Sequence, residues 1–289
     1  MPGAGCTFPA STAYILQSKP TAVIAVDLGT GRRLVLAPIA GVDKLNGIAF
    51  DRSGRFGNRL LVTGPRGSSA VVLALDCRGR TKVVTTSAPR LEGGLAVAPP
   101  SFGVFGGDLI GVDEFSGKVI AIRAEGTSEV VASGLPAGSD LGPDSAAFLP
   151  PGFNSGGEAY LADYDVGSGA HPGNGVVLRL YASALASAGV AEGDLLVADE
   201  GGGGTYAIHC AAGGDCSKGR LIGQAAALSH VEGHLVLVAN HPGPVPKPLP
   251  AGQVGSAGQS GPLFVLAYAV GIVIVAALYL LYRRQRAGR

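Results

Sequence analysis

The chain lacks tryptophan altogether, has one methionine, at position 1, and is poor in charged residues, which make up 15% of its 289 positions. Its 22 Lys and Arg nearly balance its 21 Asp and Glu, giving a formal net charge of +1. The chain therefore lacks the excess of basic residues that is typical of nucleic-acid-binding proteins, and no nucleic acid partner is expected. The 47% hydrophobic content excludes an intrinsically disordered chain.

Several motifs of common enzymes and cofactor sites are also missing. The four cysteines form neither CxxC nor CxxCH, which excludes zinc ribbons and c-type haem attachment. There is no GxSxG nucleophile elbow. The glycine run at 201–204 lacks the Lys-Ser/Thr pair of a phosphate-binding loop. The sequence therefore identifies no catalytic residue.

Glycine and proline are abundant instead, with 47 and 19 copies, which favours short strands joined by tight turns over a helical bundle. Residues 44–64, 90–113 and 140–163 repeat one pattern: an apolar strand, a Gly/Pro/Phe loop and a second apolar strand that ends on Gly or Asp. Shorter copies follow at 193–199 and 233–240, and 11–17 fits the same second strand. We interpret these copies as an internal structural repeat.

Further strands with alternating apolar residues complete each repeat. Third strands are predicted at 21–27, 70–76, 118–124 and 175–181, and fourth strands at 32–38, 80–86 and 128–134. Four short antiparallel strands in about 40 to 50 residues is the period of a β-propeller blade. The sequence thus predicts an all-β propeller of five or six four-stranded blades over residues 1–240. The first blade lacks its first strand, so either residues 225–238 close the ring with the N-terminal strands or upstream sequence is missing.

The hairpin formed by Gly47–Asp51 and Leu60–Thr63 resembles those of NHL-repeat and gluconolactonase-like six-bladed propellers. The resemblance extends over residues 45–240 and implies the fold class. Gluconolactonase-like propellers carry a single divalent ion held by Glu, Asn and Asp, so the resemblance also implies a site of that class.

Polar side chains recur where the predicted second strands end. We expect them to gather around one rim of the propeller, where carboxylates could bind a divalent cation such as Ca²⁺ or Zn²⁺. Acidic and amide residues are also ordinary turn formers, so both interpretations stay open. The candidates are Asp113, Glu114, Asp163, Asp165, Asp199, Glu200 and Asn240.

The histidines and cysteines give two further expectations. The segment 230–234, HVEGH, falls in the position of a loop between first and second strands, and no metal site is expected there. Cys210 and Cys216 flank the short turn AAGGD and are expected to form a local disulfide. Counting alone would then pair Cys6 with Cys77.

Residues 263–282 contain no charged side chain and are long enough to cross a bilayer as a helix, so a single transmembrane helix is predicted. A Pro/Gly/Ser-rich linker, 241–262, precedes it, and a basic tail, 283–289, follows. Cations flank the span mainly on its C-terminal side, which predicts a cytoplasmic C-terminus and an outer N-terminal domain. They are Arg283, Arg284, Arg286 and Arg289, against Lys247 before the span.

The first 20 residues do not read as a signal peptide, although an exported domain needs one. Either the natural start lies upstream, which we favour, or the protein is tail-anchored with its domain in the cytosol. Leu249–Gly252 before the span also resembles a cell-wall sorting signal but lacks the Thr expected before Gly.

These features lead to two functional hypotheses. The first is a membrane-anchored module at the cell surface whose propeller binds a protein or glycan. The alternative is a divalent-metal-dependent enzyme of the lactonase or sugar-oxidising kind. The two differ because such an enzyme needs at least three converging metal ligands, whereas a binding module needs only an exposed loop face.

Overall fold

The computed structural model describes residues 6–165, 172–212, 215–225 and 229–239. Residues 1–241 form one compact unit. Among the described residues, no helix has the length and apolar character needed to cross a membrane. The predicted linker, transmembrane helix and basic tail at 241–289 lie outside the described residues, as does Asn240.

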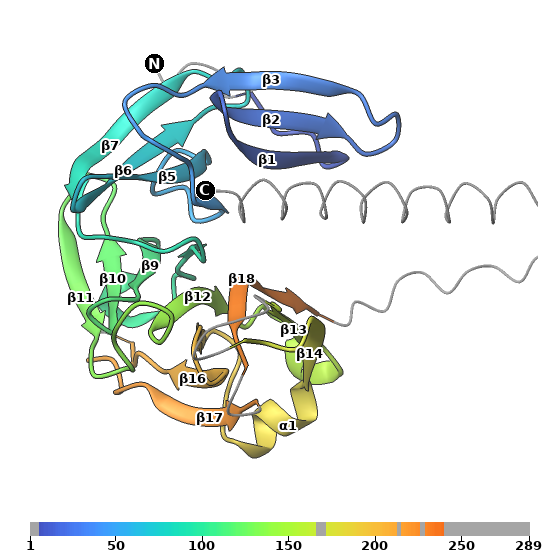
Figure 1. Cartoon of the computed structure of the whole chain (residues 1–289), viewed down its shortest axis with the longest axis vertical. Coiled ribbons are helices and arrows are strands. Elements are labelled where there is room, and N and C mark those ends of the chain that lie inside the picture. The colour runs from blue at the N-terminus through green and yellow to red at the C-terminus, as the bar shows by residue number, and fades with distance from the viewer. Residues whose placement is uncertain (1–5, 166–171, 213–214, 226–228, 240–289) are drawn as a thin grey trace, which may run out of the picture. The chain divides into compact units, whose positions relative to one another are not determined.

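Five antiparallel sheets make up the described part of the chain (Figure 1). The first sheet contains β1 (Thr12–Ser18), β2 (Thr21–Asp27) and β3 (Arg33–Pro38). The second contains β4 (Gly47–Phe50), β5 (Leu60–Arg66), β6 (Ser69–Leu75) and β7 (Thr81–Ala88). The third contains β8 (Ala96–Val97), β9 (Leu109–Asp113), β10 (Lys118–Ile122) and β11 (Ser128–Ala132).

The strands of the fourth and fifth sheets are interleaved along the chain rather than consecutive within each sheet. The fourth contains β12 (Pro143–Phe148), β15 (Leu195–Asp199), β16 (Gly204–Ile208) and β17 (Arg220–Gln224). The fifth runs β14 (Val176–Tyr181), β13 (Glu158–Asp163) and β18 (Val231–Val238). The short helix α1 (Ala182–Ser187) leads from β14 towards β15. The β13–β14 hairpin is thus an insertion between the first and second strands of the fourth sheet.

Apolar packing between consecutive sheets arranges them as propeller blades. Alternate residues of one strand face opposite neighbours: Leu60 and Val62 of β5 pack with the first sheet, and Leu61 packs with the third. In β15, Leu195 packs towards the third sheet and Leu196 towards the fifth. The first strands also contact one another, β4 with β8, β8 with β12 and β12 with β18. Side chains alternate between the two faces of a strand, and both faces of these strands are buried against neighbouring sheets. The sheets therefore stack as the blades of a five-bladed β-propeller.

Most of the predicted hairpins are confirmed. Gly47–Phe50 pairs with Leu60–Thr63, and the third and fourth strands predicted after this hairpin are β6 and β7. The blade at 90–134 is likewise built from β8 to β11. Within the described residues, however, the first and fifth sheets have three strands, so the expectation of four strands in every blade holds for the middle three sheets.

The predicted hairpin at 140–163 is wrong. Its first half, β12, pairs with β15, and its second half, β13, pairs with β14 and β18. Both β13 and β15 follow a glycine or acid and end on Asp, so the local pattern fits either partner. The pairing is decided by packing, because β15 is buried along its whole length between two sheets, whereas β13 is only partly buried.

The position of 230–234 also differs from the prediction. Instead of a loop between two strands, His230 directly precedes β18, and Val231–Val238 forms one continuous strand along β13. Gly233, with a φ of 86°, lies where the register with β13 shifts. A glycine inside a strand permits this irregularity. The sequence pattern had instead predicted a loop at residues 230–234.

Two disulfides are formed. Cys210–Cys216 closes the predicted short turn after β16, and Cys6–Cys77 ties the N-terminal segment to the turn after β6. The expected local disulfide is thus confirmed, together with the pairing obtained by counting.

A single buried carboxylate organises the loop between β4 and β5. Asp51 accepts hydrogen bonds from four backbone N–H groups, those of Ser53, Gly54, Phe56 and Asn58. We predict that Asp51→Ala lowers the free energy of unfolding by about 3 kcal/mol, because four backbone N–H groups, among them the buried one of Phe56, lose their acceptor. Urea denaturation measures the change, with Asp43→Ala, at an exposed position, as the control. A loss below about 1 kcal/mol would contradict this assignment.

Candidate functional site

The site lies at the edge of the sheets where second strands end and first strands begin. Glu114 follows β9, Glu200 follows β15 and His230 precedes β18. Because first and second strands are antiparallel, the end of one lies beside the start of the other. The site is tied together by backbone hydrogen bonds, from Glu200 N–H to the Gly142 carbonyl at 2.8 Å and from Val231 N–H to the Glu200 carbonyl at 2.9 Å.

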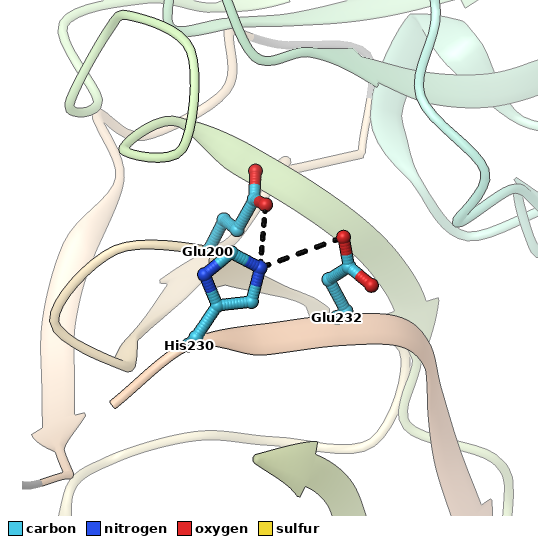
Figure 2. A group of neighbouring side chains, drawn as sticks. All are labelled: Glu200, His230 and Glu232. Carbon is cyan, nitrogen blue, oxygen red and sulfur yellow. Dashed lines mark ion pairs between the residues drawn. The ribbon is translucent and has the colours of Figure 1, made fainter. Parts of the chain in front are cut away.

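His230 lies between two carboxylates (Figure 2). Its Nε2 is 2.8 Å from Glu200 Oε1 and 3.5 Å from Glu232 Oε1. The His230 side chain is 6% exposed, and Nε2 makes no hydrogen bond of acceptable geometry despite the short distance. A ring nitrogen that is buried and close to carboxylate oxygens, but not aligned with either as a hydrogen-bond donor, is suited to ligate a cation.

Asp163 positions His230 rather than joining the carboxylates around it. One of its carboxylate oxygens accepts the His230 backbone N–H at 2.9 Å, and the other accepts the Asn174 amide at 3.1 Å. Tyr164 N–H donates to the His230 carbonyl at 2.7 Å. The start of β18 is thus held to the end of β13 by bonds at both backbone groups of His230.

A second group of acids adjoins the first through Glu200. Oxygens of Glu114, Asp140 and Glu200 lie within 4.8 Å of one another, as do the ligand atoms of Glu200, His230 and Glu232. The Asp140 backbone N–H donates to the Glu114 carboxylate. Gly142 is required here, because a Cβ would lie 2.0 Å from the Glu114 carbonyl oxygen.

Burial and neighbouring negative charges raise the pKa values of Glu200 and Asp144. Burial, the hydrogen bond with Glu114 and the charges of Glu114, Asp144 and Glu232 raise the pKa of Glu200 to about 9. Burial, opposed by a hydrogen bond from Gly233 N–H, raises the pKa of Asp144 to about 7. Negative groups this close favour a bound proton or a bound cation.

The structure therefore brings two of the predicted candidates, Glu114 and Glu200, into the groups of potential ligands and places Asp163 beside them, bonded to the His230 backbone. Asp113, Asp165 and Asp199 belong to neither group. Asp113 accepts hydrogen bonds from Phe115 N–H and the Ser116 hydroxyl, as a turn former does. Asp199 is buried and hydrogen-bonded to Tyr206, with burial raising its pKa to about 7.

Four members of the site were not selected as ligands from the sequence. Asp140 and Asp144 flank the start of β12, and His230 and Glu232 flank the start of β18. The repeat pattern had directed attention to the ends of second strands, although antiparallel pairing brings the starts of first strands to the same edge. That rule could have added Asp140 and Asp144, but not the residues near β18, whose pairing was unknown.

No family model matches the chain. No curated protein matches it either. A solved virginiamycin B lyase from Staphylococcus aureus aligns with 74% of this chain and 53% of its own, at 13% identity and a TM-score of 0.44. A nidogen/laminin complex aligns with 78% and 80% at 14% identity and a TM-score of 0.40. TolB from Acinetobacter baumannii aligns with 76% and 52% at 14% identity and a TM-score of 0.35. The chain spans about half the length of the lyase.

The buried acids predict a stability that falls as the pH rises. Asp199 has an ordinary pKa of 3.8 but one of about 7 in the folded protein, so the folded state binds its proton more tightly. Its contribution is complete below pH 4 and declines up to pH 7. We expect urea unfolding of the chelator-treated protein to show lower stability at pH 8 than at pH 5. Asp199→Asn should reduce that difference by about 2 kcal/mol. An unchanged difference would mean that Asp199 is ionised in the folded protein.

Proposed function

We propose that this protein is a binding module whose propeller holds a divalent cation among Glu200, His230 and Glu232, at the edge where it recognises its ligand. The convergence of a buried imidazole nitrogen and two carboxylates carries this proposal. The three side chains come from the end of β15 and the start of β18, two strands of neighbouring sheets. A site assembled from two blades couples cation binding to the packing of the propeller.

The donor set fits a cation on chemical grounds. One imidazole nitrogen and two carboxylates are ligands that Zn²⁺ accepts, whereas Ca²⁺ prefers oxygen alone. Glu200 and His230 are buried, which holds their side chains in place, while Glu232 is 49% exposed and leaves the site open to solvent. The Asp163 carboxylate accepts the His230 backbone N–H at 2.9 Å and so fixes the backbone that carries the ring.

We further propose that the propeller lies outside the cell and that residues 263–282 anchor it in the membrane. The two disulfides support an oxidising compartment. The charge asymmetry between Lys247 and the arginines that follow the span supports an outer N-terminal domain. A protein or a glycan is the expected ligand, recognised by loops at the cation-binding edge.

The first test is the metal content of the full-length chain, purified in mild detergent because of its apolar 263–282 segment. We expect bound Zn²⁺ or Ca²⁺ and a melting temperature that falls on chelation, because a cation at 100 times its Kd stabilises the folded state by about 2.7 kcal/mol. Glu200→Gln should abolish the chelator effect.

Glu129→Gln is the matched control, since Glu129 is an exposed acid paired with Arg123 on a different part of the propeller. It should retain the bound cation and the chelator effect. If the purified protein holds no cation and neither Zn²⁺ nor Ca²⁺ changes its melting temperature, the proposed cation-binding function is refuted.

A metal-dependent enzyme of the lactonase or sugar-oxidising kind is the second candidate. The observation that favours it is Asp144, a carboxyl group beside the cluster whose pKa burial raises to about 7, which suits a general base at neutral pH. A panel of lactones and sugars separates the two functions. Turnover that is lost in Asp144→Asn, with the cation retained, would support the enzyme, whereas binding of a protein or glycan without turnover would support the module.

Topology can be tested on intact cells through the disulfides. After mild reduction, we expect a membrane-impermeant maleimide to label the chain through Cys210 and Cys216, because the propeller is proposed to face outwards. A Cys210→Ser, Cys216→Ser double variant controls for labelling at Cys6 and Cys77. Labelling that requires cell lysis would place the propeller in the cytosol and support tail anchoring.

A further inference from the structure

The outer edge of the fifth sheet is open. The second, third and fourth sheets have four strands each, and their third strands, β6, β10 and β16, pair on the outer side with β7, β11 and β17. In the fifth sheet β14 lies at the corresponding place, beyond β18 and β13, but the chain continues from it into α1. In the part of the chain that the structure describes, no strand therefore covers β14 where the other three blades have their fourth strand.

The hydrogen bonds between β13 and β14 show which backbone groups face this open edge. Ala182 N–H donates to the Gly157 carbonyl at 2.9 Å, and these two residues continue the register of the β13–β14 pair. Opposite residues in an antiparallel pair alternate between hydrogen-bonded and non-hydrogen-bonded pairs, so the bonded positions are every second residue counted back from Ala182. The backbone N–H and C=O groups of Val177, Arg179 and Tyr181 therefore point away from β13, towards the open edge.

A regular ladder distinguishes β14 from the other outermost strands. The pairs β2–β3, β6–β7, β10–β11 and β16–β17 each contain a register shift. The β13–β14 pair runs from Glu158 opposite Tyr181 to Asp163 opposite Val176 without one. A bulge bends an edge strand and hinders the addition of another strand. Because β14 has no such bulge, its edge is suited to accept a further strand.

The side chains along β14 do not protect this edge either. Val177 is 68% exposed and Tyr181 is 46% exposed. Arg179 is the one charged residue of the strand, and it lies 3.5 Å from Glu158, with its guanidinium 4.5 Å from the centre of the Tyr181 ring. An unpaired charge commonly keeps an edge strand from pairing with another chain. Since Arg179 is neutralised within its own sheet, β14 lacks this protection.

We propose that β14 pairs with β14 of a second copy of this chain, antiparallel and about a two-fold axis, so that the two fifth sheets form one continuous sheet. Identical edges meet in this way when a two-fold axis relates the copies. With the axis at Leu178, Val177 lies opposite Arg179 of the second copy, and Val176 lies opposite its Leu180. The outward backbone groups of both copies then bond to each other.

The charge on Arg179 selects this register. Moving the axis to Arg179 would place the two guanidinium groups directly opposite each other, and like charges at opposite positions are destabilising. The axis at Leu178 separates them and sets apolar residues against apolar residues. The inference goes beyond the proposed function and does not depend on the cation site.

The experiment measures the mass of the full-length chain in detergent by light scattering, corrected for bound detergent, over a range of protein concentrations. We expect twice the mass of one chain, with dissociation on dilution. Val177→Lys should raise the dissociation constant of the dimer at least about 10-fold, because the two-fold axis places a lysine opposite Arg179 twice. Val177→Pro should also dissociate the dimer, since it removes an N–H that faces the second copy but none that bonds to β13.

Val130→Lys is the matched control. Val130 is also an exposed valine of an outermost strand, β11, but the β10–β11 ladder contains a register shift. This variant should form the dimer as the natural protein does. Melting curves verify folding, and Val177→Lys, which changes an exposed side chain, decides the result if the proline variant does not fold. Residue-resolved hydrogen exchange should be slow at the Val177 and Arg179 amides in the dimer and fast in Val177→Lys.

Each outcome decides the inference and leaves the proposed cation site to its own test. A chain that is monomeric at every concentration overturns the inference, and so does a dimer that persists in Val177→Lys. Slow exchange at the Val177 and Arg179 amides in a monomer would assign the edge to another segment of the same chain and also overturn it. A dimer that is weakened in Val177→Lys and retained in Val130→Lys supports pairing through β14.

Discussion

Packing of apolar residues between consecutive sheets is the constraint on which the rest of this structure depends. Strands such as β5 and β15 are buried on both faces, so the sheets that contain them need a neighbour on either side. Water exclusion along these interfaces supplies the main stabilising force and leaves the ends of the strands as the places where polar groups can lie. The sheets therefore stack as blades, and their strand ends meet at shared edges.

The candidate site uses one such edge at an energetic cost. Glu114, Glu200 and His230 are buried there by the sheets that carry them, and acids with few cationic partners are brought together. Burial and the neighbouring negative charges raise the pKa of Glu200, and a cation relieves the repulsion. The same packing that stabilises the propeller thus prepares a charge distribution that favours a divalent ion. Cation binding and blade packing should be coupled for this reason.

Local sequence patterns predicted the hairpins whose partners are adjacent along the chain. The hairpin of Gly47–Phe50 with β5 is of this kind, and so is the Cys210–Cys216 disulfide, because a short separation leaves few alternative partners. The pairing of β12 with β15 crosses an inserted hairpin, and two segments carried nearly the same apolar pattern. An apolar pattern with a period of two residues indicates which face of a strand is buried but not which strand pairs with it.

The sequence by itself determined the all-β class, the blade-like repeat, the local disulfide and the presence of acids after second strands. Each of these depends on residues close together in the chain. Only the tertiary structure decided that β13 joins β18, that His230 directly precedes a strand, and that Asp140 and Asp144 lie beside Glu200. Those neighbours come from segments far apart in sequence, and their contacts depend on which sheet faces bury the most apolar surface, a property of the assembled blades.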